Sequence, residues 1–209
     1  MTGKRVLMVE GPDDEHVVKN LCGARNLGKI DHVHPYGGKD PLIEGIPARL
    51  KESDLVALGI LLDADTDLHA RWEAVAHRLQ QAGYGHLPAA PTREGLVIEA
   101  PENTLLPRVG IWLMPDNQVP GILEDFLRFL VPAGDPLFAH VEQSVDRIPD
   151  GQRRFGDLKK PKAKIHTWLA WQDEPGKPLG QAIRARYLDP DLPAADVFAD
   201  WLDRTFFAP

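Results

Sequence analysis

Four acidic side chains follow two apolar runs, where a carboxylate has no ordinary structural task. Glu10 ends the stretch "RVLMVE", and Asp14 follows four residues later at the start of an expected helix. Asp63 and Asp65 come directly after the apolar run Leu55–Leu62, "LVALGILL". While the chain stays extended, Asp63 and Asp65 point to the same side. Carboxylates in such places are solvated, cap a helix or hold a cation.

Helix capping explains the neighbouring acids better than it explains these four. Asp13 suits the N-cap of the first expected helix, and Asp67 suits that of the third. Glu10, Asp63 and Asp65 lie where no helix begins, so a cap accounts for them poorly. Carboxylates this close repel one another unless a cation neutralises them, and all-oxygen ligands select Mg²⁺, Mn²⁺ or Ca²⁺ rather than zinc.

The elements that must position these acids alternate between strands and helices. Strands are expected at 4–10, 29–35, 55–62, 95–99 and 108–114. Helices are expected at 13–26, 41–51, 67–83, 122–131, 136–147, 162–172 and 193–206. The continuous apolar character of 5–9 and 56–62 predicts adjacent inner strands of a mainly parallel α/β sheet. Since ligands bind at the carboxyl ends of such strands, Glu10 and Asp63 are expected to converge.

Composition narrows the class of protein. The 209 residues are 43% apolar and 26% charged, which suits a folded domain with a sizeable core. No apolar run approaches the roughly 20 residues of a membrane helix, and no signal peptide precedes the first strand. The single cysteine, Cys22, cannot form an internal disulfide. We therefore expect a cytoplasmic protein without membrane contact.

The charge is unevenly distributed along the chain. The net charge of −7 weakly disfavours a general nucleic-acid binder. One segment, 152–165, is nevertheless basic and carries Arg153, Arg154, Lys159, Lys160, Lys162 and Lys164. An acidic cluster and a separate basic segment suit an enzyme that holds cations and approaches a polyanion. A solvated basic loop is the alternative interpretation.

Several known motifs compete for "DADTD", 63–67. An EF-hand loop requires Gly and Glu where Leu68 and Ala74 stand, so that interpretation fails. A haloacid-dehalogenase phosphatase requires Thr or Val at the position of Asp67. It also requires its aspartate on the leading strand, whereas a full strand–helix unit precedes Asp63 here, so the sequence does not match this motif. The sugar-nucleotide DxD of glycosyltransferases stays open, but it does not explain Glu10.

Two segments together resemble the Toprim domain of bacterial primases, topoisomerases and OLD-family nucleases. "VEGPDDEHVV" is similar to the first Toprim motif, with Glu10, Gly11 and Asp14 at its key positions, and "LLDADTD" is similar to the second, with Asp63 and Asp65. "YGGKDPL", 36–42, resembles the Gly-Gly-Lys turn of OLD-like domains. "MPDNQVPGILEDFL" and "KAKIHTWLAWQ" resemble later segments of an uncharacterised Toprim-like family.

Departures from the larger Toprim proteins narrow the resemblance. The three tyrosines, Tyr36, Tyr84 and Tyr187, lie in no topoisomerase-like nucleophile context. The sequence contains no zinc-finger or helicase-like companion and no Walker motif. It therefore resembles a stand-alone OLD-like Toprim domain, with a core at 1–115 and a helical part at 116–209 that completes the same domain. The resemblance leaves room for an ATPase on a separate partner chain.

The resemblance implies metal-dependent cleavage of phosphodiester bonds in DNA or RNA. It implies that the acids hold one or two Mg²⁺ or Mn²⁺ ions, and that two such ions would lie about 3.5–4 Å apart. Glu10 is expected to be a catalytic residue as well as a metal ligand. The implied metal ligands are Glu10, Asp14, Asp63, Asp65 and Glu124. Either Lys162 or Lys164 supplies the catalytic lysine. The expected nucleic-acid contacts are Lys39 in the Gly-Gly-Lys turn and, from the charge of segment 152–165, Arg153, Arg154, Lys159 and Lys160. A non-catalytic module that binds metal or phosphate, or docks onto a partner protein, is the alternative function.

Overall fold

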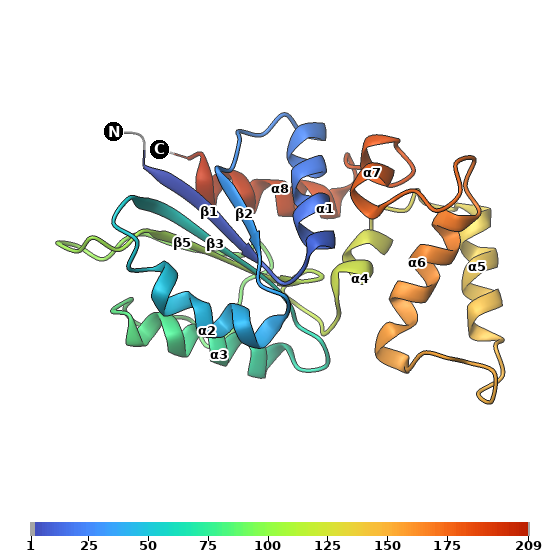
Figure 1. Ribbon diagram of the computed structural model, residues 1–209, viewed down its shortest axis with the longest axis horizontal. Coiled ribbons are helices and arrows are strands. Elements are labelled where there is room, and N and C mark those ends of the chain that lie inside the picture. The colour runs from blue at the N-terminus through green and yellow to red at the C-terminus, as the bar shows by residue number, and fades with distance from the viewer. Residues whose placement is uncertain (1–2, 209) are drawn as a thin grey trace.

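A five-stranded sheet forms the centre of the protein. The structure, a computed structural model, describes residues 3–208. The strands are β1 (Lys4–Val9), β2 (His32–Pro35), β3 (Leu55–Asp63), β4 (Leu96–Ile98) and β5 (Arg108–Met114). Their order is β2-β1-β3-β5-β4, and every neighbouring pair is parallel except β4 and β5 (Figure 1). The prediction of an α/β fold with adjacent inner strands β1 and β3 is confirmed.

Helices connect the strands and make up the C-terminal part. They are α1 (Pro12–Ala24), α2 (Lys39–Arg49), α3 (Leu68–Gln81), α4 (Leu123–Arg128), α5 (Pro136–Asp146), α6 (Lys160–Ala170), α7 (Leu179–Arg184) and α8 (Pro193–Phe206), with a 3₁₀ turn, η1, at Asp157–Lys159. Most lie within a few residues of the expected ranges. Two were not predicted, α7 and η1, because six and three residues are too few to establish an apolar period.

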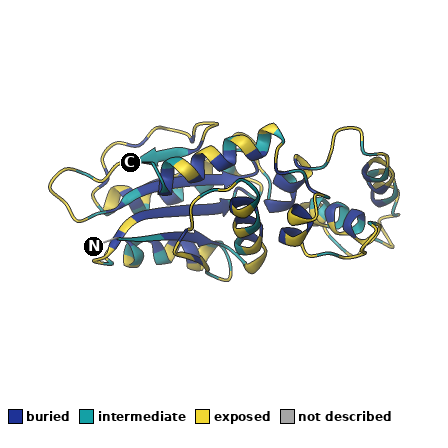
Figure 2. Ribbon diagram, turned by 90° about the horizontal axis from the view of Figure 1, so that it is seen from above, coloured by how far each residue is buried: buried dark blue, intermediate teal, exposed yellow. Residues whose placement is uncertain are grey.

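Alternate residues of β1 point into two separate apolar layers. Val6 and Met8 pack with the side of the sheet that α2 and α3 cover. Leu7 and Val9 pack with the opposite side, which α1 and α8 cover (Figure 1). All four side chains are fully buried, and the inner strands are buried along most of their length (Figure 2). Burial on both faces is the physical reason that this run is continuously apolar.

The C-terminal helices divide between the sheet and a projecting lobe. Phe198 and Trp201 of α8 pack against Trp112 of β5. Helix α7 lies so close to α1 that a Cβ at Gly180 would be 2.6 Å from the carbonyl oxygen of His16. Helices α5 and α6 instead pack on each other and project from the sheet (Figure 1); we call residues 136–170 the α5–α6 lobe.

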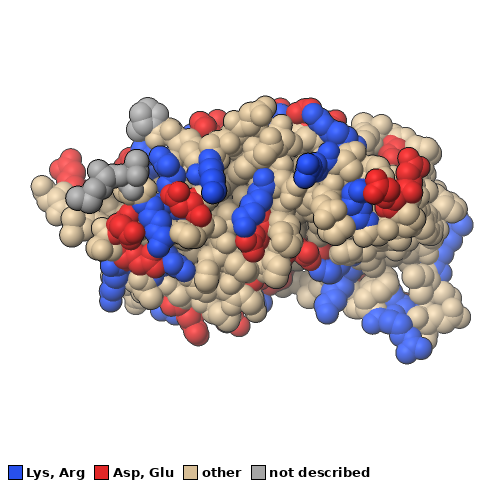
Figure 3. Space-filling model, turned by 45° about the horizontal axis from the view of Figure 1, so that its top comes forward, with Lys and Arg blue, Asp and Glu red and all other residues tan. Residues whose placement is uncertain are grey.

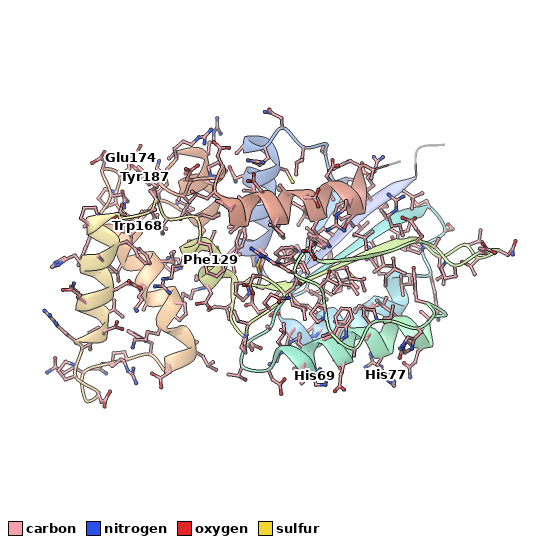
Figure 4. The ribbon with its side chains drawn as sticks, turned by 180° about the vertical axis from the view of Figure 1, so that it is seen from behind. His69, His77, Phe129, Trp168, Glu174 and Tyr187 are labelled. Carbon is pink, nitrogen blue, oxygen red and sulfur yellow. The ribbon has the colours of Figure 1, made fainter. Side chains whose placement is uncertain are left out.

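The lobe has its own buried aromatic contact. The Trp168 ring meets Phe138 edge-on at 5.9 Å between centroids, and Trp168 is almost fully buried. Figure 4 labels Trp168 on α6. The lobe and the layer under α1 and α8 belong to one continuous apolar cluster. The expected division into a core at 1–115 and a helical part at 116–209 stays a prediction. Among residues 3–208, no helix has the length and apolarity needed to cross a membrane.

Candidate functional site

The carboxyl ends of β1 and β3 bring Glu10 and Asp63 together. Glu10 follows β1, Asp63 ends β3, and the Glu10 Oε1 atom accepts a hydrogen bond from the Asp63 backbone N–H at 2.9 Å. The Asp63 Oδ1 atom accepts one from the Leu123 N–H, at the start of α4, also at 2.9 Å. Two carboxylates therefore join β1, β3 and α4 at one edge of the sheet.

Asp14 lies at the same edge and stabilises the first turn of α1. Gly11 is the N-cap of this helix, and its N–H donates to the Asp14 Oδ2 atom at 2.9 Å. The prediction that Asp13 caps α1 is wrong, because Asp13 is already inside the first turn and the capping box uses the third helical residue. Asp67 does cap α3, accepting the Ala70 N–H at 2.9 Å.

Burial and mutual repulsion raise the pKa values of these three acids. Burial has the larger effect in each case. It raises the pKa of Asp63 to about 9, with help from the charges of Asp14, Glu10, Glu124 and Asp65. It raises the pKa of Asp14 to about 7, with help from Glu10 and Glu124. The pKa of Glu10 is also raised, chiefly by burial and secondarily by Asp65. The five predicted acids therefore share one electrostatic environment.

Asp65 does not point where the sequence predicted. Its backbone has φ +55°, so the chain leaves the extended path directly after β3 and the expectation based on strand geometry fails. The Asp65 Oδ2 atom lies 3.0 Å from the Lys39 Nζ atom and 2.8 Å from the Arg71 Nη2 atom. Arg71 was not predicted as a site residue. The sequence feature that could have identified Arg71 is its place in the first turn of the helix that follows "DADTD".

Glu124 meets the lysine that the resemblance required. The carboxylate is 4% exposed and lies 3.0 Å from the Lys162 Nζ atom on α6, with His166 Nε2 at 3.9 Å. Partial burial opposes the charge of Lys162, but the hydrogen bond and charge of Glu124 outweigh it and raise the lysine's pKa. Lys162 also lies 3.7 Å from Asp13. Between the two candidate lysines, only Lys162 reaches the acidic edge.

Lys164 and much of the basic segment face acids of the lobe instead. Lys164 lies 3.2 Å from Asp146, which also pairs with Lys160 at 2.8 Å. Arg153 pairs with Asp157 at 2.8 Å. Arg154 and Lys159 are exposed. On the face drawn in Figure 3, acidic and basic side chains mix over the sheet-bearing part, while Lys and Arg project at the end that holds the lobe.

The carboxylates suit a hard cation in chemistry but are not arranged around one. Within residues 3–208, no group of three or more His, Cys, Asp or Glu side chains is positioned to hold a metal ion. Glu10, Asp14 and Asp63 offer only oxygen atoms, as Mg²⁺ and Mn²⁺ prefer. Each uses one oxygen to accept a backbone N–H, which leaves the other oxygen for a cation.

The comparison with known proteins identifies a family whose description states no function. A family model described as "Protein of unknown function (DUF3226)" matches residues 4–207. No curated protein and no solved structure matches the chain. The matched range runs from the first residue of β1 to the residue after α8 and contains every site residue described above. The chain therefore belongs to the DUF3226 family.

Proposed function

We propose that this protein is a Mg²⁺- or Mn²⁺-dependent nuclease of the Toprim type, acting on phosphodiester bonds in DNA or RNA. The observation that carries the proposal is the group of three carboxylates Glu10, Asp14 and Asp63, of which Asp14 is buried and the other two are half-buried. Desolvation and neighbouring acids raise the pKa values of all three. Unneutralised acids at the carboxyl end of a parallel sheet favour a cation-binding role over a structural one.

The chain supplies complementary charge around these acids. Three cationic side chains lie at the edge of the acidic group. Lys162 pairs with Glu124, and Lys39 and Arg71 both pair with Asp65. In the proposed reaction Glu10, Asp14 and Asp63 bind the cation, and Lys162 stabilises negative charge on the phosphate. A bound Mg²⁺ supplies Lewis acidity and lowers the pKa of a water molecule. The resemblance to OLD nucleases extends the proposal to an ATPase on a separate chain.

A non-catalytic module is the second candidate, and one observation favours it. Asp65 and Glu124, two of the five predicted ligands, already face cations of the chain itself, and the acids do not surround an ion site. Such an arrangement suits a domain that binds a metal or a phosphate group without cutting.

A cleavage assay separates the two functions. Supercoiled plasmid and single-stranded DNA and RNA oligonucleotides are incubated with wild type, Asp63→Asn and Asp173→Asn in Mg²⁺ or Mn²⁺. Asp173 is exposed and is not one of the site residues described above, so its variant controls for the chemical change itself. The nuclease proposal expects cleavage by wild type and by Asp173→Asn and none by Asp63→Asn. Cleavage by no protein, on any of the substrates, supports the binding module.

Thermal melting tests the cation site without relying on activity. Mg²⁺ or Mn²⁺ at ten times its dissociation constant stabilises the folded state by about 1.4 kcal/mol, because the ion binds only the folded protein. The melting temperature of wild type should therefore rise with added ion. Asp63→Asn should lose this rise, and Asp173→Asn should keep it. An unchanged wild-type melting curve at millimolar ion would remove the cation from both proposals.

A further inference from the structure

Two cationic side chains, Lys39 and Arg71, meet at a single oxygen atom. The Asp65 Oδ2 atom lies 3.0 Å from Lys39 Nζ and 2.8 Å from Arg71 Nη2. Two positive charges around one carboxylate leave an excess of positive charge beside the acidic group. One anionic oxygen between a lysine and an arginine is also the contact that a phosphate oxygen makes in phosphate-binding sites.

Arg71 is fixed in place by the strand end that precedes it. Its side chain is only 12% exposed, and its Nε atom donates to the backbone oxygen of Asp63 at 3.0 Å. This bond fixes the plane of the guanidinium group, so its remaining donors point in a set direction. A rigid arginine of this kind is suited to recognising a planar or tetrahedral anion rather than to solvating the surface.

Lys39 reaches the same point from a turn that leaves the surface open. It begins α2 directly after Gly37 and Gly38, whose φ angles are +80° and +138°. A Cβ added at either glycine would meet nothing within 4 Å. Glycine is therefore required there by the backbone conformation and not by crowding. The space over the turn is free for a ligand, and 42% of the Lys39 side chain is exposed toward solvent.

We propose that Lys39 and Arg71 form a phosphate-binding pair that holds a backbone phosphodiester of the nucleic acid beside Glu10, Asp14 and Asp63. Asp65 is the internal counter-ion of this pair and occupies the position of a phosphate oxygen when no nucleic acid is bound. The proposal rests on the proposed function for its ligand. It assigns a role to Arg71 and gives Asp65 a task other than metal binding.

Binding, measured apart from cleavage, tests the pair. The probe is a fluorescein-labelled single-stranded DNA oligonucleotide of 20 nucleotides in Ca²⁺, with fluorescence anisotropy as readout and its length verified on a gel afterwards. The variants are Lys39→Ala and Arg71→Lys. Arg78→Lys is the matched control for Arg71→Lys. Arg78 lies two turns further along α3, so the same substitution is made on the same helix but away from Asp65.

The two variants are expected to weaken binding in different ways. Lys39→Ala should raise the dissociation constant about tenfold and reduce the slope of log affinity against log salt by about 1, because one phosphate contact is lost. Arg71→Lys should weaken binding to a similar extent with an unchanged slope, since it keeps the charge and loses the fork. Arg78→Lys should bind as wild type does.

The outcomes separate this proposal from the proposed function. If wild type does not bind the oligonucleotide, or if both variants bind it as wild type does, the phosphate-binding pair is wrong. Cleavage by wild type alongside unchanged binding by the variants would overturn the pair and leave the nuclease intact. Weakened binding by both variants, with no cleavage by wild type, would support the pair and overturn the nuclease.

Discussion

The acidic edge of the sheet and the basic α5–α6 lobe carry opposite charge, and they differ in how that charge is balanced. In the lobe, Lys160 and Lys164 share Asp146, so both of these lysines have an acid beside them near the surface. At the sheet edge, desolvation and neighbouring acids raise the pKa values of Glu10 and Asp63, and for Glu10 they outweigh the nearby charges of Arg71 and Lys39. A run of charge in a sequence therefore says little until the burial and the partners of each group are known.

The largest effect is expected from Asp63→Asn, which removes one charge from the unbalanced region. Cleavage should disappear, as the assay above tests. The metal-free variant should also be more stable than wild type by at least about 1 kcal/mol at pH 7, because each unit of raised pKa is worth about 1.4 kcal/mol. Asn keeps the acceptor for the Leu123 N–H. Urea unfolding in EDTA measures the change, and a destabilised variant would show that Asp63 is a structural residue instead.

The second effect compares two lysines of α6. Lys162→Met should reduce cleavage by on the order of a hundredfold, because Lys162 is the one of these two lysines that reaches Glu124. It should also destabilise the protein by about 1–3 kcal/mol, since a buried carboxylate loses its partner. Lys164→Met, the matched change two residues away on the opposite side of α6, should leave the cleavage rate unchanged. The opposite ranking of the two cleavage rates would assign the catalytic role to Lys164.

The third effect is the pH dependence of stability without metal. The folded protein holds more protons than the unfolded chain, because burial raises the pKa of Asp63 to about 9 and of Asp14 to about 7. The free energy of unfolding should therefore fall as pH rises from 5 to 8, by up to about 1.4 kcal/mol per pH unit for each such proton. Urea titrations in EDTA should show a shallower slope for Asp63→Asn. Equal slopes would mean that Asp63 titrates normally.

The smallest effect is expected in the balanced region. Lys160→Ala removes one of the two lysines that pair with Asp146. The Lys160–Asp146 ion pair lies near the surface. The melting temperature should change by less than about 2 °C, because such ion pairs contribute little and are screened by salt. Repeating the scan in 0.5 M NaCl checks the cause. A larger shift would show that the lobe depends on its charges as much as the sheet edge does.

The fold could be predicted largely because burial marks the inner strands. The apolar runs of β1 and β3 required cover on both faces, and that placed Glu10 and Asp63 at one edge. The direction of Asp65 could not be predicted, since one residue with φ +55° turns it toward Lys39 and Arg71.

The choice between Lys162 and Lys164 was also beyond the sequence. The two side chains leave opposite sides of α6, and only the packing of α6 against α4 and α5 decides which side faces Glu124. The lobe itself could not be predicted as a projecting part, because its helices have the same amphipathic pattern as helices that pack on a sheet.

The α5–α6 lobe is an addition to the sheet that supplies Lys162 to the acidic edge. Residues 136–170 pack mainly on themselves, and Lys162 is their ionic link to the buried Glu124. A descendant that lost this hairpin would keep the sheet, all five acids and the pair Lys39 and Arg71, but it would lose the lysine beside Glu124. Under the proposed nuclease function, loss of the hairpin would leave the proposed cation and phosphate contacts in place without the lysine proposed to act in cleavage.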